Sequence, residues 1–260
     1  MIKYGQSTRR GDSCVIGRSG NPTLRDNTFQ NSGQVSSGQR MTIEGTVNKS
    51  FIMLAILLGA AFVTWSMYNN GQNVFGLMIG GAIAGLVLAL IVSFKPTTAP
   101  ILVPIYAACE GLFLGALSAN YQSLYNGITQ QAALLTMCVF VAMLVAYRFR
   151  LIQATKNFRL GVFAATAGIA LVYLLSFVLG FFGLSVPYLH DNSLIGIGIS
   201  VVIVVVAALN LVLDFDFIES GAEQGAPKYM EWYGAFGLMV TLVWLYIEML
   251  RLLSKLASRD

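Results

Sequence analysis

Hydrophobic residues fall into seven long runs that short polar segments separate, and a polar stretch of some fifty residues precedes the first run. Each run approaches the roughly 20 residues that an α-helix needs to cross a bilayer. The pattern therefore predicts an all-α integral membrane protein built as a bundle of seven transmembrane helices. The expected spans are Phe51–Asn69, Val74–Phe94, Pro100–Asn120, Gln131–Tyr147, Leu160–Phe182, Leu194–Phe215 and Trp232–Leu250.

The amino-terminal stretch has a different composition from the rest of the chain. It is rich in Gly, Ser, Asn, Thr and Gln, contains seven Lys and Arg up to position 50, and shows no apolar periodicity. Such a segment buries too little apolar surface to offset the entropy of ordering, which predicts disorder. We divide the chain into a disordered polar cytoplasmic tail, residues 1–48, and a seven-helix membrane domain, residues 49–256.

Charge placement predicts the orientation. Only 11% of the residues are charged, against about 25% in soluble domains. Thirteen Lys and Arg lie in the tail and in alternate loops, and the intervening loops contain none, so the tail is expected on the cytoplasmic side. The net charge of +4 is explained by this placement and does not indicate a nucleic-acid partner. The expected surroundings are the lipid bilayer.

The last predicted span poses a conflict with that rule. Arg251, Lys255 and Arg259 follow it and would lie outside if it crosses the membrane. A re-entrant last segment would return them to the cytoplasm. We favour a true crossing because Trp232–Leu250 is long enough to span.

Small residues recur at four-residue spacing in the second and third spans. This spacing lets helix backbones approach closely in lipid, so it predicts helix packing and no chemistry. The motifs are Gly76-x-x-x-Gly80, Gly81-x-x-x-Gly85 and Ala107-x-x-x-Gly111-x-x-x-Gly115.

Four of the twelve acidic residues lie in the fourteen positions 210–223 (NLVLDFDFIESGAE), at the end of the sixth run. Carboxylates in a membrane span are costly and indicate function. Asp214 shares a helix face with Asn210 and is expected in the bundle interior. Asp216 points about 200° away from Asp214, shares a face with Glu219, and is expected at the cytoplasmic rim. The alternative is that the helix stops here and the acids are solvated.

Glu110 lies ten residues into the third span, near the expected membrane midplane. Its carboxyl group is expected to face the bundle interior in a protonated or hydrogen-bonded form. A purely structural hydrogen bond is the alternative. Glu248, three residues before Arg251, is expected to form a surface ion pair.

Motifs for enzymatic chemistry are absent from the sequence. It has no phosphate-binding glycine loop with Lys-Ser/Thr, no His-Glu-x-x-His and no nucleophile elbow. The single histidine, His190, and the dispersed cysteines Cys14, Cys109 and Cys138 do not have the spacing of a metal site. We expect a non-enzymatic protein without a cofactor.

Three segments resemble the Bax inhibitor-1 family, the transmembrane Bax inhibitor motif proteins, in a bacterial branch. They are PIYAACEGLFLGALS at 104–118, NLVLDFDFIESG at 210–221 and LVWLYIEMLRLL at 242–253, and the resemblance covers about residues 45–256. It implies six helices around a central seventh, a cytoplasmic amino terminus in the bacterial inner membrane, and a pH-sensitive calcium leak. In that family two aspartates on the last two helices share a proton and close the pore.

The sequence departs from this pattern at one of the two aspartates. Asp214 matches the first, and the second falls on Thr241, ten residues before Arg251. Two close carboxylates interact strongly enough to form a pH switch. Asp214 facing Thr241 would make an ordinary hydrogen bond with a weaker pH response. Glu110 supplies the missing carboxylate if the third span packs beside the sixth.

The leading hypothesis is a cation leak, with Ca²⁺ as the transported ion because it prefers carboxylate and carbonyl oxygen. Asp214 would be the gate and a transient Ca²⁺ ligand, Glu110 its proton-sensitive partner, and Asn210 and Thr241 neighbours on the pathway. The alternative is a regulatory protein in stress response or membrane-protein turnover that does not transport ions. Its basic tail would then bind a membrane-protein partner.

Overall fold

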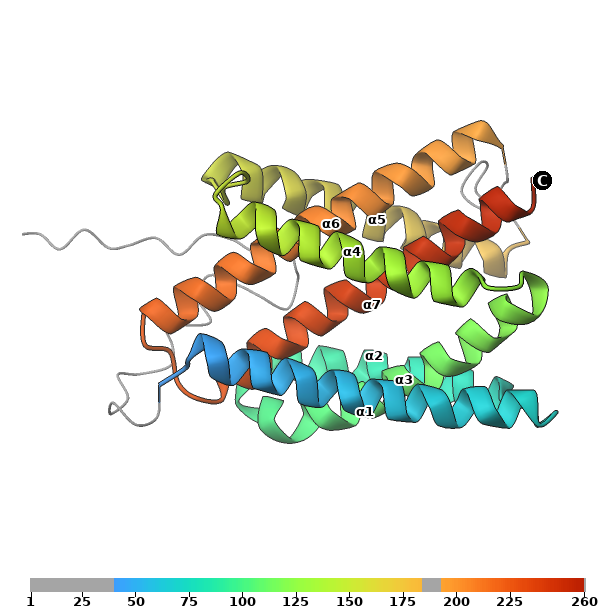
Figure 1. The fold of residues 1–260 in the computed structure, drawn as a ribbon, viewed down its shortest axis with the longest axis horizontal. Coiled ribbons are helices and arrows are strands. Elements are labelled where there is room, and N and C mark those ends of the chain that lie inside the picture. Colours follow the sequence, from blue (N-terminus) through green and yellow to red (C-terminus); the bar gives the residue numbers. More distant parts are fainter. Residues whose placement is uncertain (1–39, 184–192, 260) are drawn as a thin grey trace, which may run out of the picture.

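The computed structural model describes residues 40–183 and 193–259. Within these residues the chain forms seven α-helices, all long and apolar enough to cross a membrane, which confirms the predicted bundle. A short 3-10 helix, η3 (Pro96–Thr98), links the second and third (Figure 1). The helices are α1 Ile43–Asn69, α2 Phe75–Phe94, α3 Ala99–Leu124, α4 Ile128–Arg148, α5 Lys156–Phe181, α6 Leu194–Glu223 and α7 Met230–Ala257.

Several helices extend beyond the apolar runs that predicted them. Helix α1 begins at Ile43, eight residues before Phe51, because the Thr42 side chain caps it by accepting a hydrogen bond from the Gly45 backbone N–H (3.0 Å). Hydropathy reports the lipid-facing length of a helix, whereas caps and backbone hydrogen bonds set its ends. The predicted boundary at residue 48 is therefore wrong, since residues 43–48 are helical. The predicted disorder of residues 1–39 lies outside the described residues.

Helix α6 also continues, eight residues past Phe215 to Glu223. The alternative in which the helix stops before the acidic residues is therefore wrong. Helix α7 is likewise continuous over 28 residues and carries Arg251 and Lys255 within its last two turns. Its length agrees with a single crossing.

Helices α6 and α7 are the most buried of the seven. Helix α7 packs against α1, α3, α4 and α6, whereas α2 packs mainly on α3, and α5 mainly on α6. Figure 1 shows α7 running diagonally between the α1–α2–α3 side and the α4–α5–α6 side of the bundle. The arrangement of six helices around a central seventh stays a prediction, because α2 and α5 find their principal partners elsewhere.

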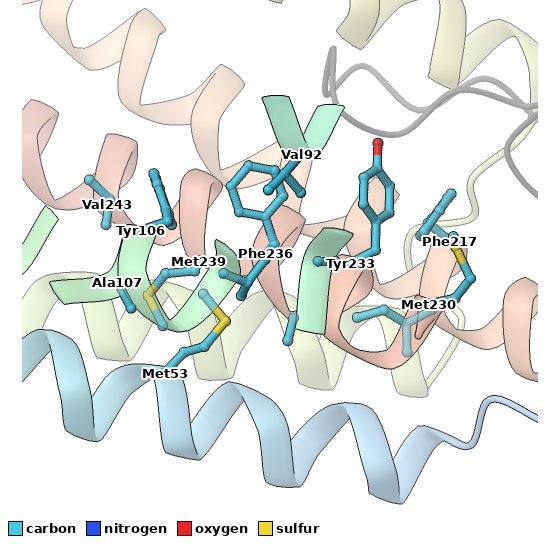
Figure 2. Packing of buried hydrophobic residues seen from close by; sticks show 14 of the residues in the cluster. Met53, Val92, Tyr106, Ala107, Phe217, Met230, Tyr233, Phe236, Met239 and Val243 are labelled. Carbon is cyan, nitrogen blue, oxygen red and sulfur yellow. The ribbon is translucent and has the colours of Figure 1, made fainter. Parts of the chain in front are cut away.

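Two apolar clusters meet on α7. The first joins α1, α2, α3, α6 and α7, and in it Tyr106 packs edge-on against Phe236 with ring centroids 4.9 Å apart (Figure 2). The second joins α4, α6 and α7, with Phe215 edge-on to Phe140 at 5.7 Å. Because α7 contributes to both clusters, it holds the two sides of the bundle together.

The small-residue motifs differ in what they do. A Cβ added to Gly111 would lie 2.3 Å from the carbonyl oxygen of Leu57, and one added to Gly115 would lie 2.2 Å from that of Ala61, so α1 and α3 touch backbone to backbone there. Gly81 meets α3 in the same way, and Gly85 meets the Glu110 side chain. Gly76 and Gly80 face open space.

Candidate functional site

Asp214 lies in the protein interior on α6 and has no exposed surface. Asn210, one turn earlier, is also buried, and its Nδ2 donates to Thr166 Oγ1 of α5 (2.8 Å) and to the Val206 carbonyl (2.9 Å). Asn210 therefore links α6 to α5. The pair forms a polar patch inside an apolar helix, where it has few solvent contacts to offset its burial.

Thr241 is buried on α7, which packs along α6. Its hydroxyl donates to the Gly237 carbonyl of its own helix (3.3 Å). This back-bond satisfies the hydroxyl proton locally. The predicted hydrogen bond between Thr241 and Asp214 stays a prediction.

Glu110 is oriented toward α2. A Cβ added to Gly85 would lie 2.8 Å from Glu110 Oε1, so the carboxyl group occupies the space that the missing side chain leaves. Helix α3 packs on α1, α2 and α7, and it does not form an extensive pair with α6. The structure therefore does not bring Glu110 and Asp214 together in the described conformation. The short η3 connection explains this, because it folds α3 directly back on α2.

Asp216 and Glu219 lie where α6 nears its end, and each has a partner on a neighbouring element. Arg159 of α5 forms an ion pair with Asp216 (Nη2 to Oδ2, 2.6 Å), and the Tyr147 hydroxyl of α4 donates to Glu219. Since Asp216 is about one-fifth exposed, water still reaches this pair. We call the end of the bundle that holds these residues, the start of α1 and the start of α7 the tail end.

A cleft of about 680 Å³ opens at the tail end between α1, α4, α6 and α7. Asp216 and Glu219 line it together with Tyr147, Arg148 and Arg150, whereas Asp214 and Thr241 do not. The predicted rim residues thus border a real cavity. The predicted gate residues lie behind its wall, on the packed faces of α6 and α7.

Sequence reasoning missed a further, fully buried carboxylate at the tail end. Glu231 is fully buried, accepts hydrogen bonds from the Thr42 backbone N–H (3.0 Å) and hydroxyl (2.9 Å), and forms an ion pair with Lys49. Beside it, the Met41 N–H donates to the Ala226 carbonyl (2.6 Å). These contacts fasten the start of α1 to the α6–α7 turn. Glu231 lies beside an apolar run, and nothing in the sequence around it indicates a contact with the start of α1.

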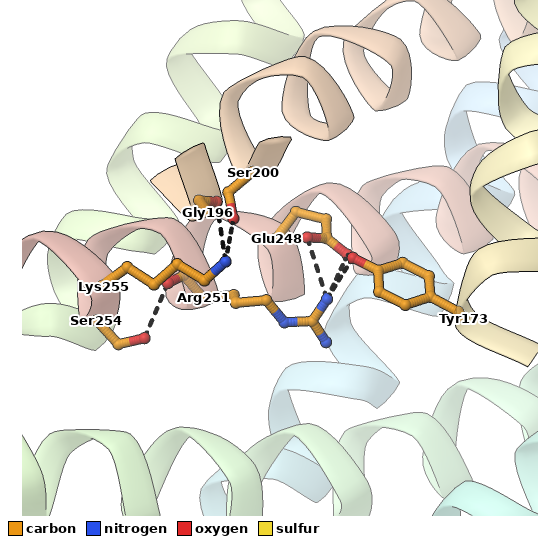
Figure 3. Close-up of polar contacts among 7 residues, drawn as sticks. All are labelled: Tyr173, Gly196, Ser200, Glu248, Arg251, Ser254 and Lys255. Atoms are coloured by element: carbon orange, nitrogen blue, oxygen red, sulfur yellow. Dashed lines mark hydrogen bonds and ion pairs between the residues drawn. The ribbon is translucent and has the colours of Figure 1, made fainter. Parts of the chain in front are cut away.

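The opposite end of the bundle holds a polar cluster centred on Glu248 of α7 (Figure 3). The predicted pair with Arg251 is present (3.2 Å), but its predicted surface position is wrong, because the Glu248 side chain is only 2% exposed. Tyr173 of α5 covers it, donates to Oε1 (2.9 Å) and accepts a hydrogen bond from Arg251. A tie to a helix 75 residues away cannot be read from the sequence around Glu248.

Lys255 is buried under the start of α6. Its Nζ donates to the Gly196 carbonyl (3.0 Å) and to Ser200 Oγ (2.9 Å), as Figure 3 shows. Arg251 and Lys255 therefore make structural contacts within the bundle rather than lying free in a loop. This removes much of the conflict that they posed for the orientation rule.

No three His, Cys, Asp or Glu side chains gather as a metal site within the described ranges 40–183 and 193–259. Asp216 and Glu219 line the same cleft, whereas Glu231 and Glu248 are held by separate ion pairs at opposite ends of α7.

The model of a known family, described as Bax inhibitor 1 like, matches residues 21–258. The chain belongs to this family. Comparison with curated proteins and with solved structures found no match. The family match covers the whole helical bundle, including the helix pair that carries Asp214 and Thr241.

Proposed function

We propose that this Bax inhibitor 1-like protein is a non-enzymatic cation leak pathway, with Ca²⁺ as its ion and Asp214 as its gate. The observation that carries the proposal is the complete burial of Asp214 on the closely packed pair α6 and α7, next to a cleft with carboxylates on its rim. A buried carboxylate in a membrane bundle is expensive to maintain without a role.

The cleft supports a path for ions from the tail end. Asp216 and Glu219 are oxygen ligands at its rim, of the kind that attract a hard cation. Phe215 and Leu238, which belong to the same two helices as the gate, line the wall between the cleft and the interior. A small separation of α6 from α7 would connect the cleft with Asp214. In this proposal the described packing of α6 on α7 is the closed state of the leak.

We place the tail end in the cytoplasm of a bacterium and the bundle in its inner membrane. The α4–α5 connection and the helix ends beside it carry four basic residues at the tail end, namely Arg148, Arg150, Lys156 and Arg159. At the opposite end, Arg251 is engaged by Glu248, and Lys255 by α6. Positive charge flanking the spans favours the cytoplasmic side.

The pH response is proposed to come from Asp214 without a second aspartate. Protonation of a gate carboxylate removes the charge that binds the cation, so leak should fall as the medium is acidified. Thr241 offers no second carboxylate to share a proton with Asp214. A weaker pH response is therefore expected than from a paired site.

The test is Ca²⁺ flux into proteoliposomes between about pH 5 and about pH 8. Wild type should show a flux that Asp214→Asn changes severalfold and makes independent of pH. Glu110→Gln reports whether the carboxyl group facing α2 contributes, and Glu44→Gln, at an exposed position, is the matched control. Absence of flux at every pH, or an unchanged Asp214→Asn profile, would overturn the proposal.

A regulatory role without transport is the second candidate, and the docking of the tail junction favours it. Met41 is fixed to the α6–α7 turn and Thr42 to the start of α7, so the segment that follows residue 39 has a defined place at the tail end. Deleting residues 1–39 removes the tail and keeps this contact. Loss of a stress phenotype with flux intact would support the regulatory role, and loss of flux would support the channel.

A further inference from the structure

The tail-end cleft is one half of a longer groove. A second cavity, of about 380 Å³, lies between α1, α3, α4 and α7 and continues toward the opposite end of the bundle. The two cavities share lining residues on three helices, namely Leu54, Met137, Met239 and Leu242. Helices α1 and α4 each pack on α7 but form no extensive pair with each other, and Figure 1 shows α7 between them. We call this continuous space the α1–α4 groove.

The groove changes in chemistry along its length. Four hydroxyl-bearing residues line the second cavity, and its other side chains are apolar, among them Phe62, Trp65 and Ala133. Along α4 it runs from Arg148 to Thr129, which is about 29 Å at the helical rise of 1.5 Å per residue. That length exceeds the roughly 15 Å of one leaflet of the hydrocarbon core. The groove can therefore hold a complete acyl chain.

Two arginines and two carboxylates line the tail end of the groove, and Arg159 neutralises one of the carboxylates, so this end carries a net positive charge. Asp216 is engaged by Arg159, and Glu219 by the Tyr147 hydroxyl. Arg148 and Arg150 line the same end, are exposed, and make no ion pair within the part of the chain that the structure describes. Guanidinium groups bind phosphate in a bidentate manner, so this end complements an anionic headgroup.

We propose that the α1–α4 groove binds an anionic phospholipid, with its phosphate at Arg148 and Arg150 and one acyl chain lying over Met239 and Leu242. The groove opens sideways between two membrane-spanning helices, so lipid is the molecule that meets it. The two arginines select the headgroup, and the apolar half holds the chain. The site shares the tail-end cleft with the proposed ion path, but it does not include the buried Asp214 and its test needs no ion flux.

The test uses the full chain in detergent micelles, titrated with phosphatidylglycerol or phosphatidylcholine that carry the same brominated chains. Bromine quenches a nearby tryptophan, and Trp65 lines the groove, whereas Trp232 and Trp244 do not. In a Trp232→Phe/Trp244→Phe background, Trp65 should be quenched at lower concentrations of phosphatidylglycerol than of phosphatidylcholine.

Two variants test the two halves of the site. Arg148→Gln/Arg150→Gln should weaken phosphatidylglycerol binding about 10- to 30-fold and leave phosphatidylcholine binding unchanged. Its control is Lys156→Gln, which removes a charge from the same connection outside the groove. Ala133→Phe should block quenching by both lipids, and its control is Ala164→Phe, an exposed alanine on α5.

Each result decides the proposal. Equal affinities for the two lipids, or an unchanged affinity in the double arginine variant, would overturn headgroup recognition. Undiminished quenching in Ala133→Phe would mean that only lipid around the bundle is detected, which would overturn the groove as a site. Unchanged thermal unfolding of each variant shows that the fold is intact.

Discussion

Glu231, in the first turn of α7, accepts two hydrogen bonds from Thr42, the residue that caps α1. The Thr42 hydroxyl donates a hydrogen bond to Glu231 and accepts one from the Gly45 N–H. The same side chain therefore caps α1 and links α1 to α7. Lys49, one turn further along α1 from Gly45, completes the contact as the counter-ion of the carboxylate. The first and last helices are thereby joined at the tail end.

Glu231→Gln should lower the thermal stability of the bundle measurably. The amide leaves Lys49 without its counter-ion beside a fully buried position, and hydrogen bonds to a charged group are stronger than neutral ones. A loss of about 2–3 kcal/mol is expected, measured by unfolding in detergent. Glu44→Gln, on the exposed first turn of α1, should change little. Equal stabilities for the two variants would contradict the assigned role of Glu231.

Gly45→Ala should be destabilising for the same reason, although alanine normally stabilises a helix by about 0.5–1 kcal/mol relative to glycine. The added Cβ would lie 2.2 Å from Glu231 Oε1, so the carboxylate must leave its position. In a Glu231→Ala background the same substitution should become neutral or favourable. Gly59→Ala, on the same helix with no neighbouring atom within 4 Å, is the control. Destabilisation that persists without Glu231 would exclude this explanation.

The seven helices could be predicted because lipid selects strongly on length and apolar character. The ends of the helices could not be predicted from hydropathy. The Thr42 cap and the polar last turns of α6 extend their helices through hydrogen bonds, which a hydropathy pattern does not show. The burial of Asp214 was accessible from its one-turn spacing to Asn210 inside an apolar run. The residues that contact Asp214 from other helices could not be predicted. Periodicity assigns a side chain to one face of its helix, but it does not show which helix packs against that face.

The same limit explains Glu110 and Glu248. Mid-span position placed Glu110 inside the bundle, but only the packing of α3 on Gly85 shows that it is oriented toward α2. The spacing of Glu248 and Arg251 predicted their ion pair. The pair is buried because Tyr173 of α5 covers it and donates a hydrogen bond to Glu248. Local pairs are encoded within a few residues, whereas long-range partners follow from the order in which helices pack.

Gly115→Ala should separate α1 from α3 and destabilise the bundle by about 2–4 kcal/mol. Its Cβ would lie 2.2 Å from the Ala61 carbonyl oxygen, which is backbone and cannot rotate away. Gly80→Ala, in a motif of the same spacing on α2, should have no such cost because nothing lies within 4 Å. Unfolding of the two variants in detergent shows whether a glycine at this spacing lies in a close helix contact, as Gly115 does, or only matches the motif, as Gly80 does. Equal stabilities would contradict the close approach of α1 and α3.

Tyr173→Phe should loosen α5 from α7. Helix α5 packs mainly on α6, and the Tyr173 hydroxyl is its hydrogen-bonded tie to Glu248 and Arg251. Removing the hydroxyl leaves a buried carboxylate with one donor fewer, at a cost of about 1–3 kcal/mol. Faster amide hydrogen exchange in α5 and a lower unfolding temperature should follow. Phe177→Leu, at an exposed position one turn along, is the control that should leave exchange unchanged.

Arg159→Gln should increase Ca²⁺ entry if the acidic rim feeds the proposed leak. The ion pair at 2.6 Å neutralises Asp216, so its removal adds one uncompensated negative charge to the cleft. Clefts of one sign concentrate the opposite ion, and a few-fold rise in flux at low ionic strength is expected, declining with added salt. Asp216→Asn should abolish the gain when combined with Arg159→Gln. Lys156→Gln, three residues earlier and not paired with Asp216, is the matched control, and an equal rise in that variant would assign the effect to general surface charge.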